Sequence, residues 1–126
     1  MGDLNNVQIG SVVLNMVENV PSYISGATLW NIVDNERLFA EQFTGESIGT
    51  SINEKYQPSI ISLSIASVLR MMELQGTDTS NIKLGEFSIS KGANSSSMSV
   101  SDTVREDGLV KLKALGTDYS FYKALG

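Results

Sequence analysis

The sequence predicts a mainly α-helical protein: one domain over residues 1–126, built as a four-helix bundle with a short β-ribbon between the third and fourth helices and an extended C-terminal tail. Three observations support this prediction. Apolar residues recur at three- and four-residue spacing in four separate segments, as in helices with a buried face. Two-residue alternation occurs in one stretch alone, and aromatic residues crowd the last ten positions. A chain of this length supplies one hydrophobic core rather than two.

The third helix gives the strongest signal, because Pro58 to Gln75 is the longest nearly unbroken apolar run. On a helical wheel, Ile61 and Ile65 fall on one side, and Leu63 and Leu74 fall on roughly the opposite side. A helix that is apolar over most of its circumference must be covered by several neighbours. The charged residues within a run of this length argue against a membrane span. The polar or small wedge of this helix consists of Ser59, Ser62, Ala66, Arg70 and Glu73.

The start of the third helix has two interpretations. Ser51 and Glu54 match a capping box, which predicts a helix over residues 52–75 with a kink at Pro58. Pro58 is also typical of a first helical turn, which predicts a later start. Gly76 ends the helix in either case.

The first helix is predicted over residues 4–19, with Asp3 as its N-cap and Pro21 ending it. The fourth is predicted over residues 101–115 and is closed by Gly116. Acidic side chains belong in a first turn for electrostatic reasons, and this accounts for Glu106 and Asp107.

The second helix is predicted over residues 27–43. Ser25 is its candidate N-cap, and Gly45 stands where a left-handed terminating residue belongs. Three large apolar residues lie off its main stripe and would leave exposed apolar surface on a monomer, which is more often an interaction site than an accident. They are Trp30, Leu38 and Phe39.

The ribbon is predicted over residues 82–91. Ile82 and Leu84 have one parity and Phe87 and Ile89 the other, so a bulge or tight turn is expected at Gly85. An isolated two-stranded ribbon is marginal in water, and we expect this one to pack on the bundle or to pair with another chain.

The C-terminal tail, residues 117–126, contains four large apolar residues although a free chain end is normally polar. We expect it to dock either on its own domain or on a neighbouring one. The four residues are Tyr119, Phe121, Tyr122 and Leu125.

Composition excludes several kinds of chemistry. The chain has no cysteine and no histidine, so a thiol nucleophile, a histidine-based triad and the usual zinc sites are ruled out. The serines of the central helix have no nearby lysine in the sequence to serve as base, and we expect neither catalytic residues nor a cofactor nor a metal. A formal charge of −5 argues against a nonspecific phosphate-binding surface. The N-terminus has no basic region followed by an apolar core, so cytoplasmic synthesis is expected.

Five short segments between Ser25 and the C-terminus carry a family resemblance. They are Phe43-Thr44-Gly45, Lys55-Tyr56-Gln57, Lys83-Leu84-Gly85-Glu86-Phe87 with Lys91-Gly92, Leu112 to Gly116, and Phe121-Tyr122-Lys123-Ala124-Leu125-Gly126. In order and spacing they resemble the head-tail connector, or neck adaptor, proteins of tailed bacteriophages. No single segment is a chemical fingerprint.

The resemblance implies a structural virion protein rather than an enzyme. Its subunits, usually twelve, would form a ring that joins the portal to the phage tail and continues the channel through which DNA leaves. The implied partners are identical subunits, the portal protein and a tail-completion or tail protein, with DNA as passing cargo and no membrane. The implied location is the virion neck, after assembly in the cytoplasm of the host bacterium.

Ring contacts join one face of a subunit to a different face of the next, so each subunit needs two apolar surfaces beyond its core. The alternative is a small helical regulatory or protein-binding module that acts as a dimer through the same faces. The residues expected at the interface are Trp30, Leu38, Phe39, Ile82, Lys83, Leu84, Gly85, Glu86, Phe87, Ile89, Tyr119, Phe121, Tyr122 and Leu125.

Overall fold

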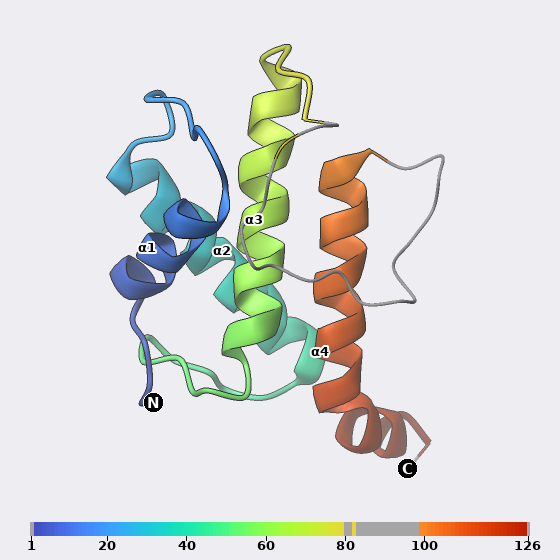
Figure 1. Cartoon of the computed structure of the whole chain (residues 1–126). Helices are drawn as coiled ribbons and strands as arrows, with labels where there is room; N and C mark the ends of the chain where they lie inside the picture. The colour runs from blue at the N-terminus through green and yellow to red at the C-terminus, as the bar shows by residue number, and fades with distance from the viewer. Residues whose placement is uncertain (1, 80–81, 83–98, 126) are drawn as a thin grey trace.

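The computed structural model describes residues 2–79, 82 and 99–125, the last ten of these by their backbone alone. The described residues form four helices and no β-strand: α1 (Asn6–Met16), α2 (Gly26–Thr44), α3 (Gln57–Leu74) and α4 (Val100–Leu125) (Figure 1). The predicted mainly helical class is therefore confirmed. The ribbon expected at 82–91 lies outside the described residues except for Ile82, which packs against the core.

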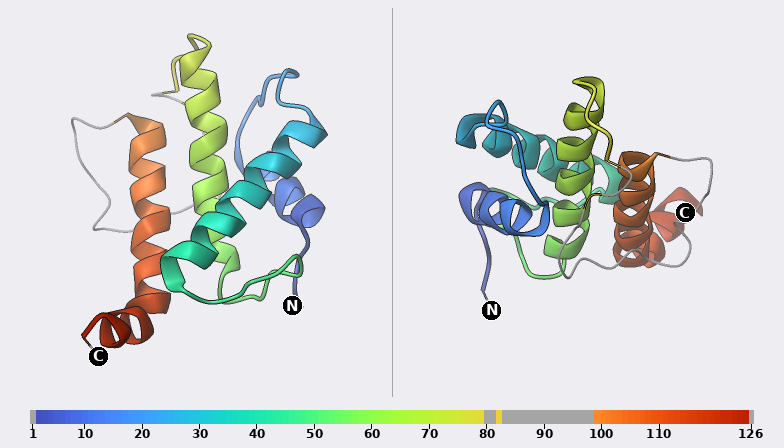
Figure 2. Two further views of the ribbon diagram at one scale, coloured as in Figure 1. Left: turned by 180° about the vertical axis from the view of Figure 1, so that it is seen from behind. Right: turned by 45° about the horizontal axis from the view of Figure 1, so that its top comes forward.

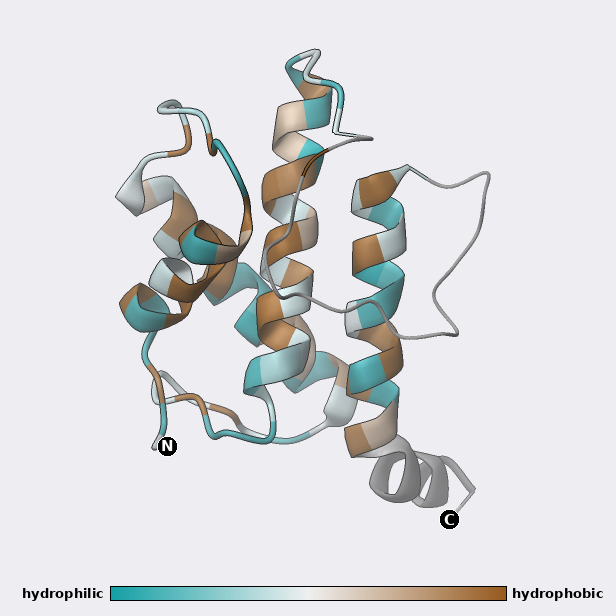
Figure 3. Ribbon diagram, viewed as in Figure 1, coloured by the Kyte–Doolittle hydropathy of each residue, from teal (hydrophilic) through white to brown (hydrophobic). Residues whose placement is uncertain are grey.

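α3 is the centre of the bundle and contacts each of the other three helices. α1 lies on one side of α3 and α4 runs antiparallel to it on the other, while α2 crosses α3 obliquely from the α1 side to α4 (Figures 1 and 2). Hydrophobic residues recur along most of α3 (Figure 3). The prediction that this helix needs cover from several neighbours is confirmed, because Ile60, Leu63, Ile65 and Leu69 all have no exposed surface.

The polar wedge of α3 contributes to its contact with α4. Ser62 Oγ lies 2.9 Å from Asp107 Oδ2, and Glu73 Oε1 accepts a hydrogen bond of 2.6 Å from Ser101 Oγ. Glu73 also accepts from the backbone N–H of Ser101, so a side chain of α3 satisfies one of the open amides in the first turn of α4.

The ends of α2 agree with the prediction to within one residue. Ser25 Oγ accepts the backbone N–H of Thr28, and Gly45 has the left-handed φ of 74° that a C-terminal glycine provides. Local signals sufficed here because the cap residues stand directly beside the helix.

The start and end of α1 differ from the prediction. Asn5 rather than Asp3 is the N-cap, because its side chain accepts from the Gln8 N–H while the Gln8 side chain accepts from the Asn5 N–H. The helix ends at Met16, before the residue with a positive φ, Asn19.

α3 begins at Gln57 with Pro58 in its first turn, so the start at residue 52 is wrong and the later start is correct. Ile52 instead forms an antiparallel bridge with Leu4, and its side chain is fully buried. Burial of the Ile52 side chain thus favours the bridge over a helix start at this position, although Ser51 and Glu54 match a capping box.

α4 continues through Gly116 to Leu125, so the predicted end at residue 115 and an extended tail from residue 117 are wrong for the backbone. A glycine inside a helix costs about 1 kcal/mol relative to alanine, which is not enough to end a helix whose next residues include no proline. None of the helices among the described residues is long and apolar enough to cross a membrane.

Candidate subunit interface

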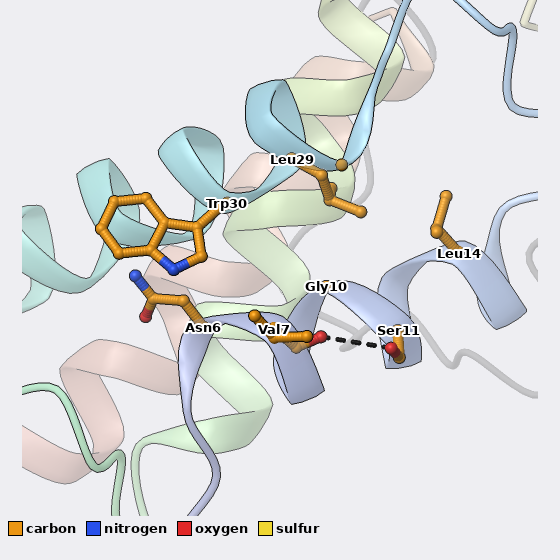
Figure 4. A pocket seen from close by; sticks show the side chains of 8 residues that line it. Asn6, Val7, Gly10, Ser11, Leu14, Leu29 and Trp30 are labelled. Carbon is orange, nitrogen blue, oxygen red and sulfur yellow. Dashed lines mark hydrogen bonds between the residues drawn. The ribbon is translucent and has the colours of Figure 1, made fainter.

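An apolar groove of about 260 Å³ lies between α1 and α2 (Figure 4). Three of the residues around it are large and apolar yet well exposed: Val7 at 64%, Leu14 at 45% and Trp30 at 42%. Side chains of this kind, gathered at one depression, are typical of a surface that another molecule covers. The groove is lined by Asn6, Val7, Gly10, Ser11, Leu14, Gly26, Leu29 and Trp30.

The sequence of α1 explains the groove. Val7, Gly10, Ser11 and Leu14 follow one another at the spacing that places residues on one face of a helix. Gly10 lets α2 approach closely, because a Cβ on it would lie 3.2 Å from the Leu29 side chain. Two small residues between two large ones leave a depression bounded by apolar walls.

No charged residue occurs anywhere in α1, although 18% of the chain is charged. Trp30 stands beside Asn6 at one end of the groove, and Leu14 stands at the other (Figure 4). Because neither helix face contributes a charge to the lining, the groove is a surface without electrostatic preference for an anion or a cation.

The charged group next to the groove is neutralised within the chain. Asn6 Nδ2 donates to Asp34 Oδ1 over 3.1 Å, and Arg37 Nη2 donates to the same oxygen over 2.9 Å. Burial acts to raise the pKa of Asp34, but the hydrogen bonds from Arg37 and Asn6 outweigh it and lower the pKa below its ordinary value. Asp34 is therefore an ionised, internally paired carboxylate.

The expected interface residues of α2 divide into two groups. Trp30 and Leu38 are exposed, each at 42%. Phe39 is partly buried: its ring lies 5.8 Å from that of Phe43 and 5.1 Å from the guanidinium carbon of Arg105 on α4. Phe39 thus contributes to contact between α2 and α4 within one chain.

The remaining expected residues belong to the second half of the chain. Ile82 is partly buried against the core. The backbone of Tyr119, Phe121, Tyr122 and Leu125 belongs to α4, and their side chains are not among those described. Six further ribbon residues lie outside the described residues: Lys83, Leu84, Gly85, Glu86, Phe87 and Ile89.

A buried polar cluster between α3 and α4 was missed by the sequence reasoning. Lys111 Nζ lies 2.7 Å from Asp107 Oδ2 and 2.9 Å from Ser62 Oγ, so a serine of the central helix does have a lysine beside it. Asp107 is fully buried and lies beyond the first turn of α4, so its assignment to that turn is also wrong.

This cluster has the composition of a serine-lysine pair but not the access that a nucleophile needs. Ser62 has no exposed surface, and the ammonium of Lys111 forms an ion pair with Asp107. An ion pair between a fully buried carboxylate and a partly exposed ammonium, with additional hydrogen bonds, joins two elements and fixes their register. The arrangement therefore positions α4 on α3.

Glu36 has a similar role between α2 and its neighbours. This glutamate is 7% exposed; it accepts hydrogen bonds from Ser67 on α3 over 2.7 Å and from Arg105 on α4 over 3.3 Å. Among the described residues, no group of three or more acidic side chains is arranged to hold a metal ion.

No protein-family model matches the chain, and neither a curated protein nor a solved structure matches it. The resemblance to neck adaptors is therefore a prediction from the five sequence segments alone.

Proposed function

We propose that this chain is a structural virion protein of a tailed bacteriophage, a neck adaptor whose identical copies form a ring between the portal and the phage tail. The observation that carries this proposal is the distribution of exposed apolar side chains. Val7, Leu14 and Trp30 surround the groove of α1 and α2, whereas Leu74 at the end of α3 is 69% exposed and Leu115 on α4 is 39% exposed.

Exposed apolar surface in separate places is what a ring subunit requires. In a cyclic ring each copy contacts its neighbours through two different faces, so one apolar patch does not suffice. Leu74 is the last residue of α3 and Leu115 belongs to the C-terminal half of α4, and these two parts of the helices lie at opposite ends of the bundle (Figure 1). A subunit of this shape can offer one patch to a neighbouring copy and another to the portal or a tail protein.

The charge of the chain is compatible with a channel for DNA. With 14 acidic and 9 basic residues, the protein repels a polyanion overall rather than gripping it. Passage without retention is the property that such a ring needs.

The proposal is tested by mixing the full chain with the portal protein of the phage genome that encodes it. We expect a ring-shaped density on the portal by electron microscopy and a complex whose mass corresponds to several copies, about twelve by the family resemblance. A protein that remains monomeric and never joins portal or tail would contradict the proposal. A stable dimer without portal affinity would support the helical binding module instead.

A further inference from the structure

The groove between α1 and α2 differs in its chemistry from a second groove formed by the described residues. The second groove, between α3 and α4, is lined by residues that include Arg70, Asp102 and Arg105. The α1–α2 groove contains no ionisable residue, and the neighbouring Asp34 is already paired with Arg37. A partner bound there must contribute uncharged atoms, because a charge placed against these walls would lose its hydration without a counter-charge.

The charge of the whole chain narrows the kind of partner. Copies that each carry a formal charge of −5 repel one another, and acidic residues at their contact would add to that repulsion. A face without any charge is where two such copies can meet at the lowest electrostatic cost. A basic partner or a nucleic acid would instead be recognised through charged side chains, which this face lacks.

We propose that the groove between α1 and α2 binds a second copy of this chain, which inserts apolar side chains between Val7, Leu14 and Trp30. The inference rests on the proposed ring of identical subunits and assigns one of its two contact faces. Tryptophan is over-represented among the residues that dominate binding energy at interfaces, and here it forms one wall of the groove.

Trp30 also provides the readout, since it is the one tryptophan in the sequence. At low protein concentration its half-exposed indole is accessible to a quencher such as acrylamide. We expect quenching to weaken and the emission maximum to move to shorter wavelength as concentration rises, in step with the mass measured by light scattering.

Two variants and a matched control locate the contact. Leu14→Asp and Val7→Asp place a carboxylate at the groove on side chains that are already exposed, so the fold is retained, as unfolding curves will verify. Each should weaken self-association about tenfold or more, since a desolvated carboxylate there has no partner. Gln42→Glu adds the same charge at an exposed position of α2 that does not line the groove, and it should leave both readouts close to those of the parent chain.

The outcomes separate this inference from the proposed function. Self-association in which Trp30 stays fully quenchable, or which Leu14→Asp leaves intact, overturns the groove as the contact while a ring remains possible. A chain that is monomeric at every concentration also overturns the inference. The ring itself is then decided by the separate portal experiment.

Discussion

Gly108 determines how closely α4 can approach α3. A Cβ at this position would lie 2.8 Å from Cγ and Cδ2 of Leu63 and 3.2 Å from the Leu63 backbone nitrogen. Leu63 has no exposed surface, so its side chain has no space to move into. The close approach brings the backbones together beside the buried Asp107 cluster.

We expect Gly108→Ala to destabilise the fold. Overpacking in a core costs roughly 1–3 kcal/mol, which exceeds the gain of up to about 1 kcal/mol in helix propensity. Urea unfolding should show the lower midpoint. Gly26→Ala is the matched control, because nothing lies within 4 Å of a Cβ there, and it should be neutral or slightly stabilising. A stable Gly108→Ala variant would show that the two helices can separate without loss.

Individual residues were predictable from the sequence where their partners are near in the chain. Ser25 and Gly45 cap α2 through neighbours a few residues away. Asp107 and Ser62 are 45 residues apart, and Lys111 and Ser62 are 49 apart, so nothing in their local sequence links them. The sequence of α4 shows that acidic residues lie along this helix, but only the packing of α4 on α3 shows that Asp107 is buried.

Glu41 fastens the loop that follows α2 to the helix itself. Its Oε2 accepts the backbone N–H of Ile48 over 2.8 Å and that of Gly49 over 2.9 Å, and it lies 3.4 Å from Arg37 Nη1. The hydrogen bonds from Gly49 and Ile48 favour the ionised carboxylate and hold its pKa below its ordinary value. A single side chain thus fixes the start of the connection to α3.

The stabilisation by Glu41 should depend on pH. Because its pKa is lower in the folded state than in the unfolded chain, the stabilisation is fully present above the unfolded value of about 4.3 and is lost as pH falls through the folded value. We expect Glu41→Gln to lower the free energy of unfolding by about 1–2 kcal/mol at pH 7 and to approach the parent chain as pH falls through the folded value.

Urea unfolding at a series of pH values measures this difference. Glu18→Gln, at an exposed position, is the control and should parallel the parent chain throughout. If the difference in unfolding free energy between Glu41→Gln and the parent stays constant down to pH 3, the stabilisation does not depend on the negative charge of the carboxylate.

At the scale of whole helices, the sequence predicts that a helix is present more accurately than it predicts where the helix begins and ends. All four helices were predicted, because their apolar periodicity extends over many residues. The start of α3 was left open because two local signals compete, and it is decided by the bridge between Leu4 and Ile52, which no local pattern contains. The end of α4 was misjudged because Gly116 was given the weight of a terminator.

In the whole molecule, the buried and partly buried carboxylates are paired with other side chains or backbone groups of the same chain, whereas several large apolar side chains are exposed on the surface. Asp34, Glu36, Glu41 and Asp107 all have partners within the chain, so its interior charges are used in folding. The exposed apolar residues at the groove have no such partner in the described residues, and the sequence predicted only Trp30 among its three walls. Val7 and Leu14 were assigned no surface role, because periodicity alone does not show which side of a doubly apolar helix is covered.

A head-to-tail contact makes a prediction that a two-fold contact does not. If the groove of one copy receives the apolar C-terminal residues of the next, two defective variants should complement each other. Leu14→Asp loses the groove but keeps Tyr119 to Leu125, whereas a chain lacking residues 119–126 keeps the groove. Among the side chains that the structure describes, the core residues on α4 are Val104 and Leu112, which the shortened chain retains. Circular dichroism and urea unfolding check that it folds.

Neither variant alone should self-associate, because each lacks one of the two faces that a heterologous contact joins. Mixed in equal amounts, they should form a 1:1 complex in which the intact C-terminal segment of one occupies the intact groove of the other. Light scattering gives the mass of the complex. Only the shortened chain has an occupied groove, so only its Trp30 should be protected from the quencher. Trp30→Phe in the Leu14→Asp chain removes the other tryptophan, so that the fluorescence reports on the shortened chain alone. If the mixture stays monomeric although both variants fold, the contact is two-fold or the C-terminal residues bind elsewhere. Loss of helical structure on shortening would instead assign those residues to the core of the single subunit.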